Sequence, residues 1–422
     1  MFTFLHAADI HLDSPLRGLE RYPGAAVDQA RSATRLALKN LVSLAIDKAV
    51  DFVVIAGDIY DGDWKDHNTG LYFVAQMSRL RSAGIPVIMI AGNHDAANKM
   101  TRSLHLPDNV EMLSTRHAAT ASNPNLERLG VAVHGRSFAH AAETSNLVPE
   151  YPRKRSGMFN IGVLHTALDG AEGHDRYAPC SLQDLHQKDY DYWALGHVHH
   201  RQVVCRSPYV VFSGNIQGRH IRELGPKGCY LVNVDNTGSV SLQFEPLDVM
   251  RWQVCQLDLT PLQTPDELLN IFQAALTEQV QQQAEMPLAL RVVLSGTSSY
   301  HDQLLANTEH WSNQFRSAAF QSSAPVWVEK VKFETTPPHE LSSESLVDGP
   351  IGQLLQCYQE LRGDATQLHA LEGEWQELFR KLPYELLHDT DGLKAGGMQQ
   401  VQRWLDEAVA IITSRLGVGR QA

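Results

Sequence analysis

The stretch Phe52-Val53-Val54-Ile55-Ala56-Gly57-Asp58 decides the fold of this chain. Its apolar residues, rich in β-branched side chains, predict a short strand that is covered on both faces, as in a parallel sheet. The run ends abruptly in a glycine and a carboxylate. Because ligands of open α/β sheets gather at the carboxyl ends of the strands, we expect Asp58 to lie in a functional site.

Four other apolar runs end in the same way, in polar side chains that can bind metal. These are Phe2 to Ala8 before Asp9-Ile10-His11, Pro86 to Ala91 before Gly92-Asn93-His94-Asp95, Phe159 to Leu164 before His165, and Tyr192 to Leu195 before Gly196-His197-Val198-His199. Residues 28–49 and 69–81, which separate the first three runs, space their apolar side chains as a helix does. The alternation predicts a βαβ series, while the short runs and turns of 201–247 predict a more antiparallel second sheet.

In chain order, the strand ends are D-x-H, G-D, G-N-H-D, H and G-H-x-H. Any one of them occurs by chance in most chains of this length, and turn chemistry would explain it. All of them together, each at the end of a predicted strand, indicate a metal site. Carboxylate oxygen and imidazole nitrogen suit manganese, iron or zinc, and the motifs hold no thiolate for a softer metal. Two adjacent divalent ions that share a carboxylate would make water a nucleophile at neutral pH.

The composition excludes several classes of protein. A length of 422 residues predicts two to three domains, and 43% hydrophobic with 20% charged residues is ordinary for a globular protein. The net charge of −12 argues against a protein that coats nucleic acid non-specifically, although it leaves room for a local basic groove. We expect no signal peptide and no membrane association, because no apolar run approaches the ~20 residues of a membrane span. Five scattered cysteines predict reduced thiols and a cytoplasmic location.

The patterns divide the chain into four regions. The metal-binding strand ends all lie in a predicted domain of residues 1–248. Residues 249–336 alternate strands and helices and predict a small α+β domain. Residues 337–344, which begin Pro337-Pro338-His339-Glu340, predict a linker. Residues 345–422 predict helices, which would either pack on their own domain or, as grouped aromatic residues favour, dock on a partner.

The strand-end motifs together resemble those of the calcineurin-like metallophosphoesterases, over about residues 1 to 245. The resemblance implies a four-layer α/β/β/α sandwich that binds two divalent metal ions, for which we expect Mn²⁺. The implied metal ligands are Asp9, His11 and His199 for the first ion, Asn93, His165 and His197 for the second, and Asp58 between the two. The resemblance also implies that His94 protonates the leaving oxygen or stabilises the transition state, and that Asp95 orients His94.

Two segments are similar to the SbcD-type nuclease branch of this family: Ala8-Asp9-Ile10-His11-Leu12-Asp13 and Gly57-Asp58-Ile59-Tyr60-Asp61. Gly214-Asn215-Ile216-Gln217-Gly218-Arg219-His220, with Gly225-Pro226-Lys227-Gly228, looks closest to the bacterial YhaO-like DNA-repair exonuclease subgroup. The likeness implies a DNA exonuclease or endonuclease of repair or defence, in which 249–336 caps bound DNA. It also implies a homodimer and docking of the C-terminal helices on an SMC-like ATPase. Some nuclease relatives carry histidine at the position of Asp61.

Arg219, His220, Arg222 and Lys227 give this acidic chain a local basic segment. We expect the segment either to contact DNA phosphates beside the metals or to form a solvated hairpin. Two other functions stay open on the sequence. One is a phosphodiesterase or phosphatase for small phosphoesters, whose activity would not depend on DNA. The other is a scaffold that senses DNA ends for its partner, with catalysis incidental.

Overall fold

A computed structural model describes residues 1–14, 16, 19, 25–61, 67–97, 104–168, 177–265, 267–284, 286–337, 350–381 and 397–415. The chain forms two compact units, Met1–Trp252 and Gln253–Ala422. The linker expected at 337–344 lies outside the described residues except for Pro337. The boundaries expected at 248 and 336 therefore stay predictions.

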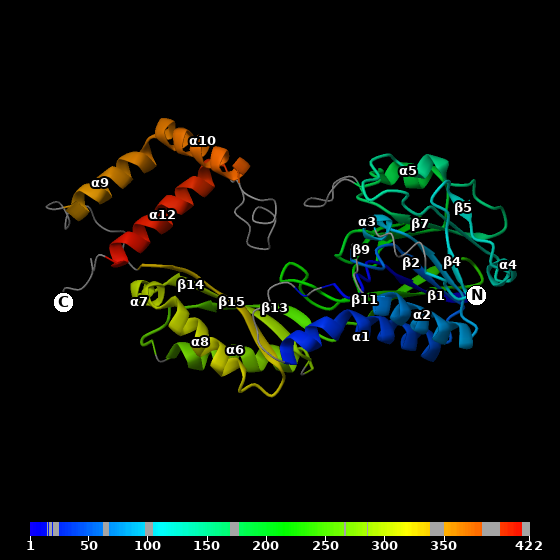
Figure 1. Cartoon of the computed structure of the whole chain (residues 1–422), viewed down its shortest axis with the longest axis horizontal. Coiled ribbons are helices and arrows are strands. Elements are labelled where there is room, and N and C mark those ends of the chain that lie inside the picture. Colours follow the sequence, from blue (N-terminus) through cyan, green and yellow to red (C-terminus); the bar gives the residue numbers. More distant parts are fainter. Residues whose placement is uncertain are drawn as a thin grey trace. The chain divides into compact units, whose positions relative to one another are not determined.

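Two six-stranded sheets form the first unit (Figure 1). The first has the strand order β12-β11-β1-β2-β3-β4, and the second has the order β5-β6-β7-β8-β10-β9. The strands of the first sheet are β1 (Phe2–Ala7), β2 (Phe52–Ala56), β3 (Val87–Ile90), β4 (Val110–Met112), β11 (Gly228–Val234) and β12 (Val240–Pro246). Those of the second sheet are β5 (Ala119–Thr120), β6 (Val131–Gly135), β7 (Phe159–His165), β8 (Tyr192–Gly196), β9 (Gln202–Arg206) and β10 (Tyr209–Phe212).

The central strands of each sheet run parallel, so their carboxyl ends lie at one edge. β1 pairs with β2 through Leu5 opposite Val53, and β2 pairs with β3 through Val53 opposite Val87. β6, β7 and β8 pair in the same parallel manner. Every residue of β2 is buried, as expected for a strand that is covered on both faces.

The first unit has four layers, in which two sheets pack on each other and helices cover the outer face of each sheet. A core of buried side chains from both sheets lies between them. The outer face of the first sheet packs on α1 (Ala25–Asp47) and α2 (His67–Ser82). The outer face of the second sheet, with Trp193 fully buried, packs on α5 (Leu182–Gln187) and its neighbouring loops. The expected α/β/β/α sandwich is thereby confirmed. Among its described residues this unit also has three short helical segments: α3 (Asn93–Ala97), α4 (Pro124–Arg128) and η2 (Val148–Glu150).

The strands of residues 201–247 form antiparallel pairs, but not the second, more antiparallel sheet that the sequence predicts. β9 and β10 pair with each other antiparallel, and β10 extends the second sheet beside β8. β11 and β12 extend the first sheet beside β1 instead. Residues 213–227 therefore cross from one sheet to the other, and they contain all four residues of the predicted basic segment.

The second unit contains a three-stranded sheet of order β13-β14-β15, in which β14 and β15 are parallel. Its strands are β13 (Arg251–Asp258), β14 (Leu288–Thr297) and β15 (Val326–Thr336), and its helices are α6 (Glu267–Gln282), α7 (His301–Ala306) and α8 (Thr308–Ala319). The rings of Phe272 and Phe315 pack edge to face in the core of this unit, with 4.9 Å between their centroids. The sequence predicts one helix over 301–320, whereas the structure interrupts it at Asn307.

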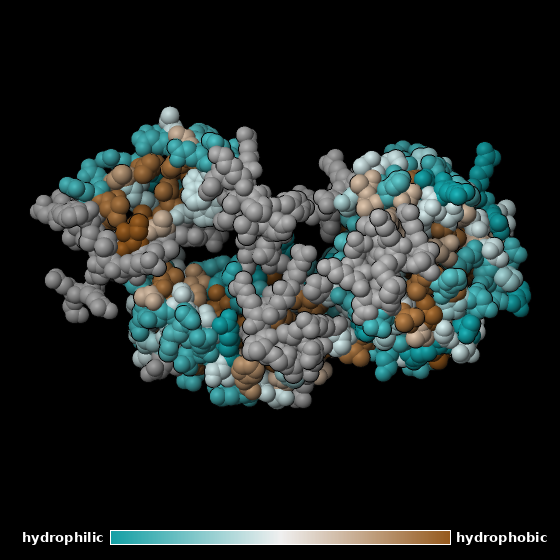
Figure 2. All heavy atoms as spheres, in the orientation of Figure 1, coloured by the Kyte–Doolittle hydropathy of each residue, from teal (hydrophilic) through white to brown (hydrophobic). Residues whose placement is uncertain are grey.

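Three more helices confirm the expected helical C-terminal region: α9 (Pro350–Gly363), α10 (Ala365–Lys381) and α12 (Met398–Arg415). Trp375 of α10 stacks on Trp404 of α12, with 4.7 Å between the ring centroids. Apolar residues gather among these helices in Figure 2. Trp375, one of the grouped aromatic residues, is thus used in packing between helices. None of the described helices is long and apolar enough to cross a membrane, and none of the five cysteines forms a disulfide within the described part of the chain.

Candidate metal centre

The polar strand ends of both sheets meet in one place. Ligand atoms of Asp9, His11 and His199 lie within 4.8 Å of one another, and so do those of Asp9, Asp58 and His165. Ligand atoms of His11, Asp58 and His94 form a third such group. Because Asp9, His11 and Asp58 each belong to two groups, the three groups form one cluster.

The backbone at this cluster is strained. Asp9 (φ 49°), His11 (φ 45°), Asp58 (φ 51°) and His197 (φ 96°) adopt positive φ values that L-residues rarely show. Hydrogen bonds hold these conformations: the amide of His197 donates to the Asp9 carboxylate at 3.0 Å, and the amide of His11 donates to the Asp58 carbonyl at 3.0 Å. Strain of this kind collects at functional sites, where the surrounding structure maintains it.

The crowding of these turns requires glycine at Gly92 and Gly196. A Cβ at Gly92 would lie 2.3 Å from Oδ1 of Asp58. A Cβ at Gly196 would lie 2.0 Å from the carbonyl oxygen of Ala56. A side chain at either position would therefore displace a strand end that carries a predicted ligand.

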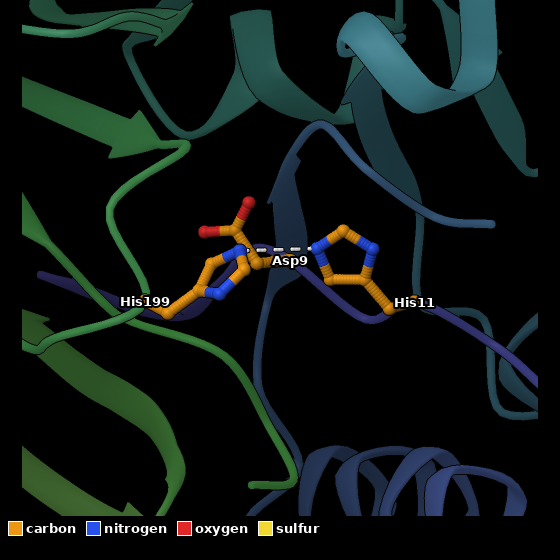
Figure 3. A group of neighbouring side chains, drawn as sticks. All are labelled: Asp9, His11 and His199. Atoms are coloured by element: carbon orange, nitrogen blue, oxygen red, sulfur yellow. Dashed lines mark hydrogen bonds between the residues drawn. The ribbon is translucent and has the colours of Figure 1, made fainter. Parts of the chain in front are cut away.

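Asp9, His11 and His199 form the first group (Figure 3). Nε2 of His11 and Nε2 of His199 face each other at 3.1 Å. Nδ1 of His199 donates to Oε1 of Glu223 at 2.6 Å. Burial opposes the charge of Glu223, but Arg219 and His199 hold the pKa of Glu223 well below its usual range, so it is a carboxylate. This bond fixes the tautomer of His199 and leaves the Nε2 lone pair directed at the group.

Asp9, Asp58 and His165 form the second group, and Asn93 lies against it. Nδ1 of His165 donates to the Ala56 carbonyl at 3.0 Å. Its Nε2 lies 2.9 Å from Oδ1 of Asn93 and 3.4 Å from Oδ2 of Asp58. The same Oδ2 of Asp58 lies 3.8 Å from Nε2 of His11, which places Asp58 between the two groups. The ring of His197 packs edge to face on that of His165, with 5.2 Å between the centroids.

The donor set fits a pair of divalent cations. Lone pairs of histidine nitrogens and carboxylate oxygens converge on the same buried volume, which is unfavourable unless a positive charge lies among them. Burial works against a charged His165, but Asp58 and Asp9 outweigh it and raise the pKa of His165 to about 9. The cluster thus draws positive charge to itself. Carboxylate and imidazole donors of this kind suit manganese, iron and zinc.

The carboxylate beside His94 belongs to Asp61, and not to Asp95 as expected. Oδ1 of Asp61 lies 3.3 Å from Nδ1 of His94. The Asp95 carboxylate accepts instead from the backbone amides of Ile59, Tyr60 and Gly92, at 2.9 to 3.1 Å. Asp95 therefore ties the turn after β2 to the turn after β3, while Asp61 is placed to orient His94.

Comparisons with known proteins agree with this geometry. Residues 2–201 match the calcineurin-like phosphoesterase family, and residues 252–336 match the middle domain of the metallophosphoesterase YhaO. A protein of Bacillus subtilis (strain 168), described as "Uncharacterized metallophosphoesterase YhaO", is 33% identical over 79% of this chain and 82% of its own length. The chain belongs to the calcineurin-like metallophosphoesterases. It is therefore a metal-dependent hydrolase of phosphoesters, and members of its family use divalent metal ions.

Two more distant relatives support the SbcD/YhaO-type branch for this phosphoesterase. The DNA double-strand break repair protein Mre11 of Sulfurisphaera tokodaii is 24% identical over 73% of the chain and 77% of its own length. An SbcCD nuclease subunit of Staphylococcus epidermidis is 23% identical over 58% of the chain and 70% of its own length.

The basic segment of the phosphoesterase touches the metal centre through Arg219. Nη1 of Arg219 lies 3.6 Å from Oδ1 of Asp61, and Nη2 lies 3.5 Å from Oε1 of Glu223. Nε2 of His220 also lies 3.5 Å from Oε1 of Glu223. Burial, opposed by Glu223 and helped by Arg219, lowers the pKa of His220 to about 4, so this imidazole is neutral at pH 7.

The other two basic residues differ in exposure. Arg222 is exposed, whereas Lys227 is buried and donates through Nζ to the main-chain carbonyl of His199 at 3.1 Å. Arg219, Lys227 and Glu223 thus form part of the packed structure around His199. An open hairpin in solvent does not describe this segment.

Sequence patterns miss two carboxylates of the phosphoesterase site. Glu223 follows directly on Arg219-His220-Ile221-Arg222, where alternating charge predicts a surface. The sequence gives only a weak indication of Glu223, namely that an acidic residue stands at the end of a basic segment. Asp61 has a clearer signal, because its position departs from the histidine of some nuclease relatives.

Proposed function

We propose that this phosphoesterase is a two-metal-dependent DNA nuclease that hydrolyses phosphodiester bonds as an exonuclease, with endonuclease activity in addition. The observation that carries the proposal is the buried cluster of Asp9, Asp58, His11, His165 and His199, whose donors need cations. DNA as substrate is supported by the relatives, one described as a DNA repair protein and one as a nuclease subunit.

The expected ligands hold two ions, for which we propose Mn²⁺. Bound divalent ions supply Lewis acidity: they favour deprotonation of water and offset charge on the phosphate oxygens. Glu223 holds Nε2 of His199 toward Asp9, and the Ala56 carbonyl holds Nε2 of His165 toward Asp58. The chain thereby prepares the ligand geometry before any ion arrives.

His94 acts on the leaving group. Its side chain is 38% exposed and therefore accessible to a substrate, whereas the neighbouring His11 is buried. Oδ1 of Asp61 lies 3.3 Å from Nδ1 of His94 and orients the ring, so that Nε2 faces the substrate and donates a proton to the departing sugar oxygen. Arg219, beside Asp61, is placed near the same substrate phosphate and offsets its charge.

The remaining parts of the chain serve DNA and a partner. The domain that matches the YhaO middle domain caps bound DNA, and α9, α10 and α12 dock on an SMC-like ATPase in DNA repair or defence. The packed, apolar junction of these helices supports a compact docking element (Figure 2). The enzyme works in the cytoplasm and forms a homodimer.

The test is degradation of end-labelled linear DNA, single- and double-stranded, with Mn²⁺. The chain would be compared with His94→Ala and with His117→Ala, an exposed histidine of the same unit that serves as a matched control. We expect cleavage that is lost in His94→Ala and kept in His117→Ala. Hydrolysis of a chromogenic phosphodiester with DNA left intact, even after addition of the ATPase partner, would favour an enzyme of small phosphoesters. Normal function of the complex with His94→Ala would favour the scaffold.

A further inference from the structure

A cavity of about 270 Å³ borders His199 next to the metal centre. The side chains that matter here are those of Arg201, Asn215, Leu224, Lys227 and Phe244, and we call the cavity the Lys227 pocket. The crossing segments at Gly214-Asn215 and at Gly225 to Gly228 form much of its wall. Both belong to the stretches that set this chain apart within its branch, and the catalytic scheme above does not use them.

The pocket has hydrogen-bond donors and positive charge to offer. Lys227 is 7% exposed, and within the described residues its Nζ makes one hydrogen bond, to the carbonyl of His199 at 3.1 Å. Since an ammonium group has three hydrogens, two remain for a ligand. Nearby anions are already engaged: Glu223 accepts from His199, and Asp248 pairs with Arg251 at 2.8 Å. The pocket therefore favours an anion such as phosphate.

A flat surface lies beside this charge. The guanidinium carbon of Arg201 is 4.0 Å from the centroid of the Phe244 ring, and Nη1 of Arg201 donates to the Pro226 carbonyl at 2.8 Å. The bond holds the guanidinium in place. Guanidinium planes and aromatic rings are surfaces on which unpaired bases stack. Leu224, 46% exposed, adds apolar surface at the pocket.

Asn215, a residue of the pocket wall, carries a buried acceptor without a donor. Asn215 is 1% exposed, and its Nδ2 donates to the carbonyl of Gln217 and to Oε2 of Glu223. Its Oδ1 has no hydrogen-bond partner within the described part of the chain. A buried acceptor of this kind is costly unless a ligand supplies a donor.

We propose that the Lys227 pocket holds one nucleotide of a DNA strand whose neighbouring phosphodiester bond lies at the metal centre. Lys227 binds the phosphate, the Arg201–Phe244 pair stacks the base, and Oδ1 of Asn215 accepts from the exocyclic amino group. His199 links the two sites, because its imidazole belongs to the metal cluster and its carbonyl accepts from Lys227. The proposal rests on the nuclease function proposed above and gives it a preference for unpaired strands.

The test uses the whole chain, in EDTA, and fluorescein-labelled single-stranded oligonucleotides, with anisotropy as the readout. The variant is Arg201→Gln, and its matched control is Arg206→Gln, an exposed arginine on β9, the strand that follows Arg201. We expect Arg201→Gln to weaken binding about tenfold, in the range of one lost base stack, and Arg206→Gln to bind as the parent chain does. Lys227→Met should lower the slope of log affinity against log salt by about one. Thermal melting of each variant confirms that it is folded.

Two comparisons separate a nucleotide from simpler ligands. Oligo-dC, which carries an exocyclic amino group, should bind more tightly than oligo-dT, which lacks one. Deoxycytidine monophosphate should compete with the oligonucleotide at lower concentration than inorganic phosphate does.

Equal affinities of Arg201→Gln and Arg206→Gln, in a chain that still degrades DNA, would overturn the pocket and leave the nuclease standing. Equal competition by phosphate would overturn the base contacts. If the chain neither binds nor degrades DNA, both the proposed nuclease function and the proposed nucleotide pocket are wrong.

Discussion

Replacing Glu223 by glutamine should weaken metal binding at the group of Asp9, His11 and His199 without unfolding the enzyme. The two oxygens of Glu223 accept four hydrogen bonds: from Nδ1 of His199 at 2.6 Å, from Nδ2 of Asn215 at 2.9 Å, from the backbone amide of Arg219 at 2.7 Å and from Nη2 of Arg219 at 3.5 Å. Glutamine replaces one of these oxygens by a donor. One of the donors that face it is then left without an acceptor, and the imidazole is no longer held by a charge.

The size of the effect on metal affinity follows from the hydrogen bond between Nδ1 of His199 and Glu223. A hydrogen bond to a charged group contributes about 1.5–3 kcal/mol, and loss of a partner that orients a metal-binding histidine typically costs 10- to 100-fold in metal affinity. We therefore expect the Kd of one Mn²⁺ ion to rise by about 10- to 100-fold in Glu223→Gln. The other ion, whose histidine ligand His165 is oriented by the Ala56 carbonyl, should keep its affinity within a few-fold.

Calorimetric titration of Mn²⁺ into the metal-free chain measures both ions. Glu223→Asp should recover part of the affinity, since it restores the charge, and Glu127→Gln, an exposed residue, is the matched control. Melting of the metal-free variant reports its folding separately from its metal binding. Unchanged affinity for both ions in a folded Glu223→Gln chain would refute the assigned role of this carboxylate.

Three further outcomes are expected. Asp61→Asn should lower kcat for phosphodiester hydrolysis by about 10- to 100-fold with little change in KM, because His94 loses the carboxylate 3.3 Å from its Nδ1; steady-state kinetics checks this. Gly92→Ala should abolish binding of at least one Mn²⁺ in calorimetry, because its Cβ would lie 2.3 Å from Oδ1 of Asp58. Burial lowers the pKa of His6 to about 3, below its ordinary 6.5, so the contribution of His6 to stability is complete above pH 6.5 and is lost as the pH falls toward 3. Between pH 6.5 and 5 the metal-free chain should lose about 2 kcal/mol relative to His6→Asn, as measured by urea unfolding.

Each of these outcomes has a control or a contrary result. A fall in Mn²⁺ affinity that matches the fall in kcat would show that Asp61 acts on the ions rather than on His94. Gly373→Ala, at a helical glycine whose added Cβ meets nothing within 4 Å, should leave metal binding intact. A parallel decline of the parent chain and of His6→Asn with falling pH would contradict the assignment to His6.

The sequence alone determined the central parallel strands and the polar residues that end them, because both follow from local patterns. Five-residue runs such as Phe52 to Ala56, which end in turn residues and are too short for a helix, indicate strands covered on both faces, and the polar residue that ends such a run lies at the sheet edge. Asp9 and Asp58 therefore lie side by side, because each follows a strand of the same parallel sheet, whereas His165 reaches them only because the second sheet packs on the first.

Tertiary structure alone decided which groups orient these ligands. Glu223 reaches His199 only because residues 213–227 cross from the second sheet to the first, and strands of alternating pattern do not record which sheet they will join. In the same way Asp95, next to His94 in the chain, turns its carboxylate to three backbone amides, and Asp61 takes the place beside the imidazole. Such contacts join segments that are distant in the sequence. The geometry of the packed sheets therefore decides them, and the periodicity of the sequence does not predict them.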